Sequence, residues 1–184
     1  MRLLPLLLFS ATITLLTAAG CERATTGDRL FEVPYPVVDL AVPAGVSSIQ
    51  TWVFAQSNLP TGTMQALLAS STDPDEVDVF GGLRCRLVSL TGEDFGEIER
   101  IELRACPVNT SGGCDRGNIV FSQGDLFRRR QQTINLNPQL LNFRELFLGS
   151  DFVRVELVFF PGQTTSRPIE ARLEWAMAAF GNVN

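Results

Sequence analysis

Four carboxylates lie close together within residues 73–78 of this 184-residue chain. Hard oxygen ligands on a loop suit Ca²⁺, so the candidate ligands are Asp73, Asp75, Glu76 and Asp78. Their spacing does not match the EF-hand pattern, and the proline inside the segment is typical of an exposed turn. The sequence therefore favours a solvated acidic turn over a calcium site, and it predicts neither a metal nor a cofactor.

Paired carboxylates can hydrolyse glycosides when they are held about 5–10 Å apart in a cleft. The chain offers two such pairs, Glu99 with Glu102 and Glu170 with Glu174. Both pairs alternate with arginines on strands that are expected to face solvent, which is typical of a salt-bridged surface. A glycan hydrolase with a carboxylate pair is therefore the least favoured function.

Histidine is absent from the whole sequence. Because His is the commonest base, proton shuttle and metal ligand near neutral pH, a Ser or Cys nucleophile here lacks its usual partner. The sequence also contains no Gly-x-Ser-x-Gly elbow and no Gly-rich phosphate loop. We therefore expect that the protein is not an enzyme.

The chain is acidic, with 20 Asp and Glu against 15 Lys and Arg and a formal net charge of −5. An acidic domain repels phosphate backbones, so we expect no nucleic-acid partner. One basic run, Arg128, Arg129 and Arg130, could contact lipid phosphates or an acidic partner. A solvated turn is the favoured interpretation of that run.

Trp52 is a further candidate for partner or sugar binding. It shares a predicted strand face with Phe54, opposite Ile49 and Val53. Exposed aromatic rings can stack on sugars or fill a partner's pocket. Burial of this face in the core or under a second layer is the favoured alternative.

Three cysteines lie in the body of the chain, at Cys85, Cys106 and Cys114. The last two flank residues 107–113, which are rich in turn formers, so closing that loop needs no long-range register. The sequence predicts a Cys106–Cys114 disulfide in preference to a Cys85–Cys106 bridge. Cys85 is then a buried free thiol on the apolar face of its strand.

Short strands must position these residues, because most of the chain shows period-2 segments separated by Gly, Pro, Asn and Asp. The predicted strands span residues 29–33, 37–42, 48–55, 82–90, 97–105, 118–122, 132–136, 152–160 and 168–180. Their alternation indicates antiparallel sheets with one dry face and one wet face. Residues 64–69 fit either a helical turn or a strand.

One short helix is predicted after residue 142. Asn142 can cap it, Glu145 can reach back to the Asn142 amide, and Gly149 can stop it. The last two strands are expected to form a hairpin, with Arg154 and Glu156 pairing across the wet face with Arg172 and Glu174.

The expected fold is all-β, an antiparallel two-sheet β-sandwich with one short helix. It forms a single domain over residues 29–184. An immunoglobulin Cys…Trp…Cys framework is missing, and both Ig-like and jelly-roll topologies remain open.

The N-terminus has the layout of a secretory signal peptide. Arg2 precedes an apolar stretch over residues 3–16, and residues 17–20 are small. The apolar stretch is too short and too interrupted to be a good membrane span. The chain is therefore expected to be exported, with residues 1–20 removed.

Residues 18–21, Ala-Ala-Gly-Cys, resemble the bacterial lipobox, although Ala18 stands where that family prefers Leu. The resemblance implies that Cys21 receives a diacylglyceryl group and that the chain is cut just before it. Residues 21–28 then form the lipidated cysteine and a polar tether. Glu22, in place of the Asp that retains lipoproteins in the inner membrane, favours the outer membrane. Plain secretion is the alternative.

The lipobox, the polar tether, the amphipathic strand at 98–105, and the terminal strands at 152–160 and 169–179 resemble the small β-sandwich lipoproteins of Bacteroidota. The resemblance covers most of the mature chain, at the level of architecture. It implies a fold and a cell-envelope location and transfers no active site.

The favoured function is that of a non-catalytic lipoprotein, held on the membrane by its lipid, which binds an envelope protein or supports an envelope assembly. Anchoring makes weak contacts useful, because it raises the effective concentration at the membrane. A carbohydrate-binding module is the first alternative, and it rests on fold analogy and the aromatic residues.

Overall fold

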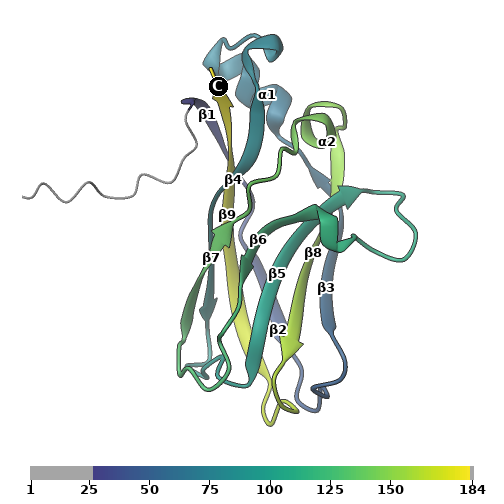
Figure 1. The fold of residues 1–184 in the computed structure, drawn as a ribbon, viewed down its shortest axis with the longest axis vertical. Coiled ribbons are helices and arrows are strands. Elements are labelled where there is room, and N and C mark those ends of the chain that lie inside the picture. Colours follow the sequence, from purple (N-terminus) through teal and green to yellow (C-terminus); the bar gives the residue numbers. More distant parts are fainter. Residues whose placement is uncertain (1–26, 183–184) are drawn as a thin grey trace, which may run out of the picture.

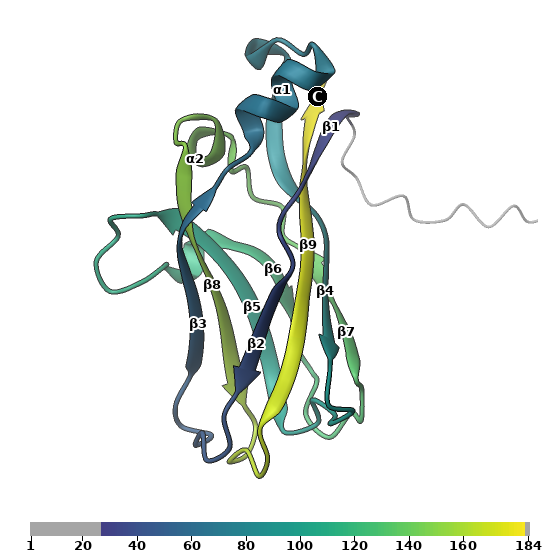
Figure 2. The ribbon, with the colours of Figure 1, turned by 180° about the vertical axis from the view of Figure 1, so that it is seen from behind.

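The computed structural model describes residues 27–182, and its nine strands form one antiparallel sheet that curls into two facing layers (Figures 1 and 2). The strands are β1 (Asp28–Pro34), β2 (Val38–Val42), β3 (Trp52–Pro60), β4 (Val79–Ser89), β5 (Ile98–Pro107), β6 (Ile119–Gln123), β7 (Thr133–Pro138), β8 (Phe152–Pro161) and β9 (Ile169–Gly181). The helices are α1 (Thr63–Ser70) and α2 (Arg144–Leu148), with 3₁₀ turns η1 (Pro74–Glu76) and η2 (Arg116–Asn118). The predicted all-β antiparallel fold is confirmed.

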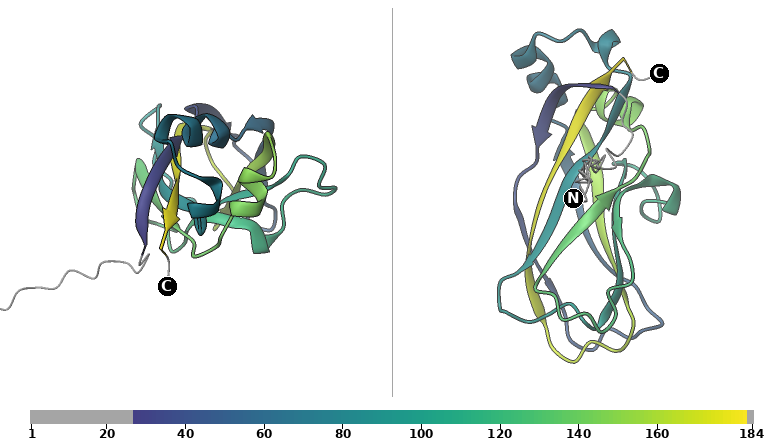
Figure 3. Two further views of the ribbon diagram at one scale, coloured as in Figure 1. Left: turned by 90° about the horizontal axis from the view of Figure 1, so that it is seen from above. Right: turned by 60° about the vertical axis from the view of Figure 1, so that its left-hand side comes forward.

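Strand β7 joins the two layers. Its first residues pair with β4, where Leu136 lies opposite Cys85, and its last residues pair with β6, where Pro138 lies opposite Phe121. The first layer contains β1, β2, β9 and β4, and the second contains β6, β5, β8 and β3. The sheet is open between β2 and β3, while α1 and α2 lie over one end of the molecule (Figure 3).

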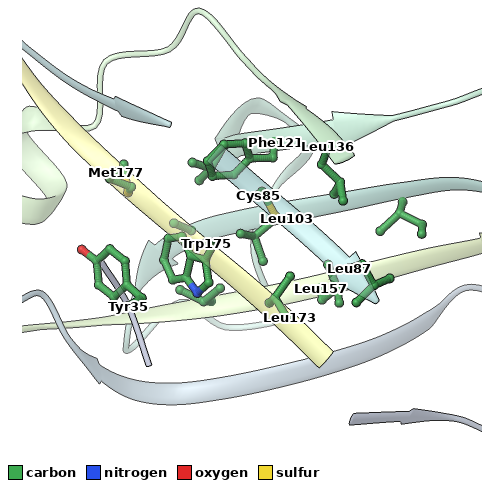
Figure 4. Close-up of a cluster of buried hydrophobic side chains, with 14 of the residues drawn as sticks. Tyr35, Cys85, Leu87, Leu103, Phe121, Leu136, Leu157, Leu173, Trp175 and Met177 are labelled. Atoms are coloured by element: carbon green, nitrogen blue, oxygen red, sulfur yellow. The ribbon is translucent and has the colours of Figure 1, made fainter. Parts of the chain in front are cut away.

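The core lies between the layers and is built from the alternate residues that the strands turn inward. Leu87, Leu103, Leu157 and Leu173 come from four different strands and are at most 3% exposed (Figure 4). Burying each such side chain contributes on the order of 1.5–3 kcal/mol. The period-2 pattern therefore places these leucines on the buried face, as the sequence indicated.

A stacked aromatic pair closes the core beside the open edge. The rings of Tyr35 and Trp175 lie 4.0 Å apart and almost parallel. The Tyr35 hydroxyl donates a hydrogen bond to the Thr61 carbonyl at 2.9 Å. Burial raises the pKa of Tyr35 far above its usual value, so the phenol stays protonated.

The structure resolves one open alternative about the helices and corrects one expectation. The segment that fitted either a helix or a strand is the helix α1, because Thr63 and Leu67 turn into the core one helical turn apart. Within residues 27–182, α1 is present in addition to the short helix predicted after residue 142. The capping residue of α2 is Phe143, and the Glu145 side chain pairs with Arg144 in solvent.

Asn142 fastens α2 to β4. Its Oδ1 accepts hydrogen bonds from the amides of Arg144 (2.9 Å) and Phe80 (3.1 Å), and its Nδ2 donates to the Asp78 carbonyl. Gly149 ends the helix, as predicted. The asparagine that the sequence marked as the cap lies one residue before the cap and ties the helix to the sheet.

Strand β3 is shifted along the chain relative to its prediction. It begins at Trp52, because the Gln50 amide donates to the Ser47 carbonyl and closes a turn there. It continues through Asn58, which has a φ of 59° and lies at an irregularity in the pairing with β8. Asn tolerates this left-handed conformation better than most residues.

The predicted terminal hairpin is wrong. Strand β8 pairs with β3 and β5 in the second layer, whereas β9 pairs with β1, β2 and β4 in the first. Both strands are apolar on their inner sides, and they face each other across the core. Arg172 accordingly pairs with Asp39 of β2 instead of a residue of β8.

Cys21 and the proposed signal peptide lie outside the described residues. Asp28, the last residue of the expected tether, already belongs to β1 and lies opposite Gly181 of β9.

Candidate functional site

Residues 107–118 form a loop that projects from the second layer between β5 and β6 (Figure 1). The sulfurs of Cys106 and Cys114 lie 2.05 Å apart, at bonding distance, with the Cα atoms 5.4 Å apart. These are the two cysteines that the sequence paired. We call residues 107–118 the disulfide loop.

Cys85 is a free thiol buried in the core. Burial raises its pKa far above the usual value, so the sulfur stays protonated and is a poor nucleophile.

Two carboxylates lie buried on the outer side of the second layer, near the disulfide loop. Glu102 of β5 and Glu156 of β8 are only 3% and 4% exposed, although the sequence placed both on a wet face. They do lie on the outer side of the sheet, as the alternation required. The prediction of exposure is wrong because the disulfide loop contacts Glu156 and because the Arg100 and Arg104 side chains pair with Glu102.

Glu156 holds the second cysteine of the loop. Its Oε2 accepts a hydrogen bond from the Cys114 amide at 2.9 Å, and its Oε1 accepts one from Arg154 Nε at 2.7 Å. Gly113 has a φ of +94°, and a Cβ at that position would lie 2.9 Å from Glu156 Oε1. Glycine is therefore required here both by the backbone conformation and by the close carboxylate.

Glu102 holds the same cysteine through an arginine. Arg104 Nε donates to Glu102 Oε2 at 2.9 Å, and Arg104 Nη1 donates to the Cys114 carbonyl at 3.2 Å. Arg100 Nε lies 3.0 Å from Glu102 Oε1 as an ion pair without hydrogen-bond geometry. Both backbone polar groups of Cys114 are thus bound by buried or partly buried charged side chains.

An aromatic ring supports these arginines. The Arg100 guanidinium lies 4.0 Å from the centre of the Phe160 ring, and that of Arg104 lies 5.9 Å from it. Such contacts favour the charged form of the guanidinium and fix its orientation. The arginine–glutamate cluster, defined as Arg100, Glu102, Arg104, Arg154 and Glu156, therefore links β5 and β8 to the loop.

An open depression of about 440 Å³ lies between the disulfide loop and α2. Its lining combines apolar side chains with amide, hydroxyl and carboxylate groups: Pro107, Gly117, Asn118, Leu141, Asn142, Phe143, Glu145, Leu146 and Ser150. Such a lining can accept a projecting apolar side chain and hydrogen-bond its neighbours. The depression and the loop together are the candidate binding surface.

The acidic turn at residues 73–78 also lies beside α2, but none of its residues lines the depression. Asp73 Oδ1 accepts a hydrogen bond from the Asp75 amide at 3.0 Å and caps η1. Arg144 donates to the carbonyls of Val77 (2.6 Å) and Pro74 (3.2 Å). Within residues 27–182, no group of three or more Asp, Glu, Cys or His residues could hold a metal ion, and this includes Asp73, Asp75, Glu76 and Asp78.

The basic run and Trp52 do not adjoin this surface. Arg128, Arg129 and Arg130 are exposed in the loop between β6 and β7, where the Arg128 amide donates to the Gly96 carbonyl at 2.7 Å. Trp52 is half-buried against the core, with its ring centre 5.3 Å from that of Phe159. The structure therefore agrees with the core interpretation of Trp52.

The carboxylate pairs are also separated from the depression beside α2. Glu99 is exposed, whereas Glu102 is buried and paired with Arg100 and Arg104. Glu170 and Glu174 are both exposed on β9. A second open depression, of about 430 Å³, lies where β7 leaves β4, and Glu174 but not Glu170 lines it.

None of the helices within the described residues is long and apolar enough to cross a membrane.

Comparison with known proteins adds one structural likeness. No family model and no curated protein matches the sequence. The structure is similar to that of Cocksfoot mottle virus, at 13% identity and a TM-score of 0.28, with 99% of this chain and 98% of that chain covered. A TM-score this low assigns neither a topology nor a function to this chain.

The sequence analysis missed Glu102 and Glu156 as the residues that organise the site. Each lies two residues from an arginine on its own strand, at Arg104 and Arg154. The useful signal was the cysteine at the end of β5, because the disulfide returns the loop to that point and places Cys114 beside the charged side chains there.

Proposed function

We propose that this protein is an envelope-anchored lipoprotein that acts as a non-catalytic binding or structural accessory protein. Its disulfide loop, with the neighbouring depression, would be the surface that contacts a protein partner. The observation that carries this proposal is the way Cys114 is held, by the disulfide and by hydrogen bonds at both its amide and its carbonyl.

A loop held in this way loses little conformational freedom when a partner binds, so more of the contact energy appears as affinity. Its outermost residues are polar and exposed, including Asn109, Ser111, Asp115 and Arg116. Leu141, which is 39% exposed, lines the depression beside them. A polar rim around a partly apolar centre is the usual arrangement of a protein-binding surface.

Lipid anchoring on the outer membrane forms the second part of the proposal. It is supported by the signal-peptide pattern and by the Ala-Ala-Gly-Cys motif at residues 18–21. Two acyl chains anchor a protein stably, whereas one does so only marginally. A lipidated Cys21 would keep the domain at the membrane and raise the effective concentration of its binding surface there.

Photo-cross-linking in intact cells tests the binding surface. A photoreactive residue at Asn109, in the disulfide loop, is compared with one at Gln163, in the exposed loop between β8 and β9. We expect a specific protein adduct from position 109 and none from position 163. Equal adducts at both positions, or no adduct at position 109, would contradict the proposal.

Cell fractionation tests the anchor. The Cys21→Ala variant should stay folded, because Cys21 precedes the first strand, and it should leave the membrane fraction. If this variant remains membrane-bound after its signal peptide has been removed, the lipid anchor is wrong.

A further inference from the structure

Helix α1 presents two large apolar side chains to solvent. Met64 is 63% exposed and Leu68 is 75% exposed. Residues four apart lie on the same side of a helix, so the two side chains are neighbours. Thr63 and Leu67, which are 1% and 5% exposed, hold the opposite side of α1 in the core. The fold therefore fixes the orientation in which Met64 and Leu68 point outward.

The segment around these side chains is uncharged. Residues 61–72 contain no Asp, Glu, Lys or Arg. Placing this segment in the interface of a lipid bilayer would therefore bury no side-chain charge. The residues that follow are acidic, at Asp73, Asp75 and Glu76, so an anionic surface would repel this end of the molecule.

Helix α1 lies at the end of the molecule where the described chain starts. Asp28 begins β1 and lies opposite Gly181, the last residue of β9, and α1 packs against β1 (Figures 1 and 2). The loop that carries Arg128, Arg129 and Arg130 lies at the opposite end (Figure 1).

The length of chain before Asp28 limits which end can approach a membrane. Cys21 and Asp28 are seven residues apart, so their Cα atoms can be separated by at most about 25 Å. Strand β9 has 13 residues and extends along the long axis for about 40 Å. A lipid on Cys21 would therefore hold the α1 end close to the bilayer.

We propose that Met64 and Leu68 form a second membrane contact, in which α1 inserts shallowly into a zwitterionic phospholipid surface. The proposal rests on the lipid anchor at Cys21. The lipid anchor then attaches the protein to the membrane, and α1 sets the orientation of the domain on the membrane surface. The basic run at the other end points away from the leaflet that carries the anchor.

Site-specific fluorescence in vesicles tests this contact. The full lipidated protein is reconstituted into phosphatidylcholine vesicles with an environment-sensitive dye on the thiol of Leu68→Cys. The matched control carries the same dye at Ile49→Cys, a position that is 91% exposed in the loop between β2 and β3. Both positions tolerate the change, because neither side chain is buried.

The expected result is a blue-shifted emission at position 68, with quenching by nitroxide-labelled lipids, and neither effect at position 49. Met64→Gln in the Leu68→Cys background should reduce the shift, and so should replacing part of the phosphatidylcholine with phosphatidylglycerol. A larger shift on anionic vesicles would overturn the apolar contact.

Flotation of the same samples separates the two possible failures. If the protein floats with the vesicles but the dye at position 68 behaves like that at position 49, the α1 contact is wrong and the anchor stands. A dye at position 68 that is shielded in intact cells but not in vesicles would assign α1 to a protein partner and overturn the lipid contact. If the protein does not float, the anchor fails, and the inference fails with it.

Discussion

The outer faces of the two layers have similar sequence patterns and different environments. On the first layer, Arg86 of β4 lies opposite Glu174 of β9, and Arg172 pairs with Asp39, with the latter two side chains 43% and 56% exposed. On the second layer, Arg104 of β5 lies opposite Glu156 of β8. Glu156 is buried there because the disulfide loop covers it.

Alternation of charged residues along a strand therefore identifies the outer face of that strand, but it does not show whether the face is exposed to water. An exposed ion pair is screened by solvent and contributes little to stability. A buried carboxylate has to be matched by donors, because an unpaired charge away from water is strongly destabilising. We therefore expect the same substitution to have very different effects on the two faces.

The largest effect is expected at Glu156. Glu156→Gln leaves Arg154 without its carboxylate and weakens the bond to the Cys114 amide, so the free energy of unfolding should fall by about 3 kcal/mol. Urea denaturation measures the change. Glu174→Gln, on the exposed face, is the matched control. Equal effects of the two substitutions would remove the distinction between the faces.

The second-largest effect on stability is expected from removing the disulfide. Replacing both Cys106 and Cys114 with Ser opens a short loop and should cost about 2 kcal/mol in unfolding free energy, in the chain-entropy view. Thermal unfolding under oxidising and reducing conditions gives the value. An unchanged transition for the double variant would mean that the arginine–glutamate cluster alone holds the loop.

Some features of this structure could be predicted from the sequence, and others could not. The inward leucines and the Cys106–Cys114 pair followed from local pattern, because strand periodicity and a short loop depend only on neighbours in the chain. The separation of β8 from β9 did not, since two strands with the same alternation can pair with each other or face each other across a core. The burial of Glu156 depends on a loop that starts about fifty residues earlier in the chain, and no pattern around Glu156 marks that contact.

Two adjacent glycines in the disulfide loop allow the effect of the Glu156 carboxylate to be compared at neighbouring positions. Gly112 and Gly113 both have positive φ values, of 82° and 94°, but only a Cβ at Gly113 would meet the Glu156 carboxylate. Either alanine variant should cost about 1 kcal/mol for backbone strain, with a further loss at Gly113 from the crowded carboxylate. Parallel denaturation curves measure the difference. Gly112→Ala as the more damaging substitution would contradict the position of Glu156.

The smallest effect is expected at Asp39. The hydrogen bond from Arg172 lowers the pKa of Asp39, so any stabilisation from this pair is present above the unfolded-state pKa and lost as the pH falls through the folded-state pKa. Because the pair is exposed, Asp39→Asn should leave the acid-unfolding midpoint unchanged within error. Acid titration followed by circular dichroism checks this. A clear shift of the midpoint would show that the first layer also depends on its charged pairs.

Amide hydrogen exchange at Cys114 tests most directly whether the buried carboxylates hold the disulfide loop ready for binding. The amide donates to Glu156 Oε2 in a site that solvent hardly reaches. We predict strong protection in the native protein and in Glu174→Gln, and a marked loss of protection in Glu156→Gln. Rapid exchange of the Cys114 amide in the native protein would contradict the account.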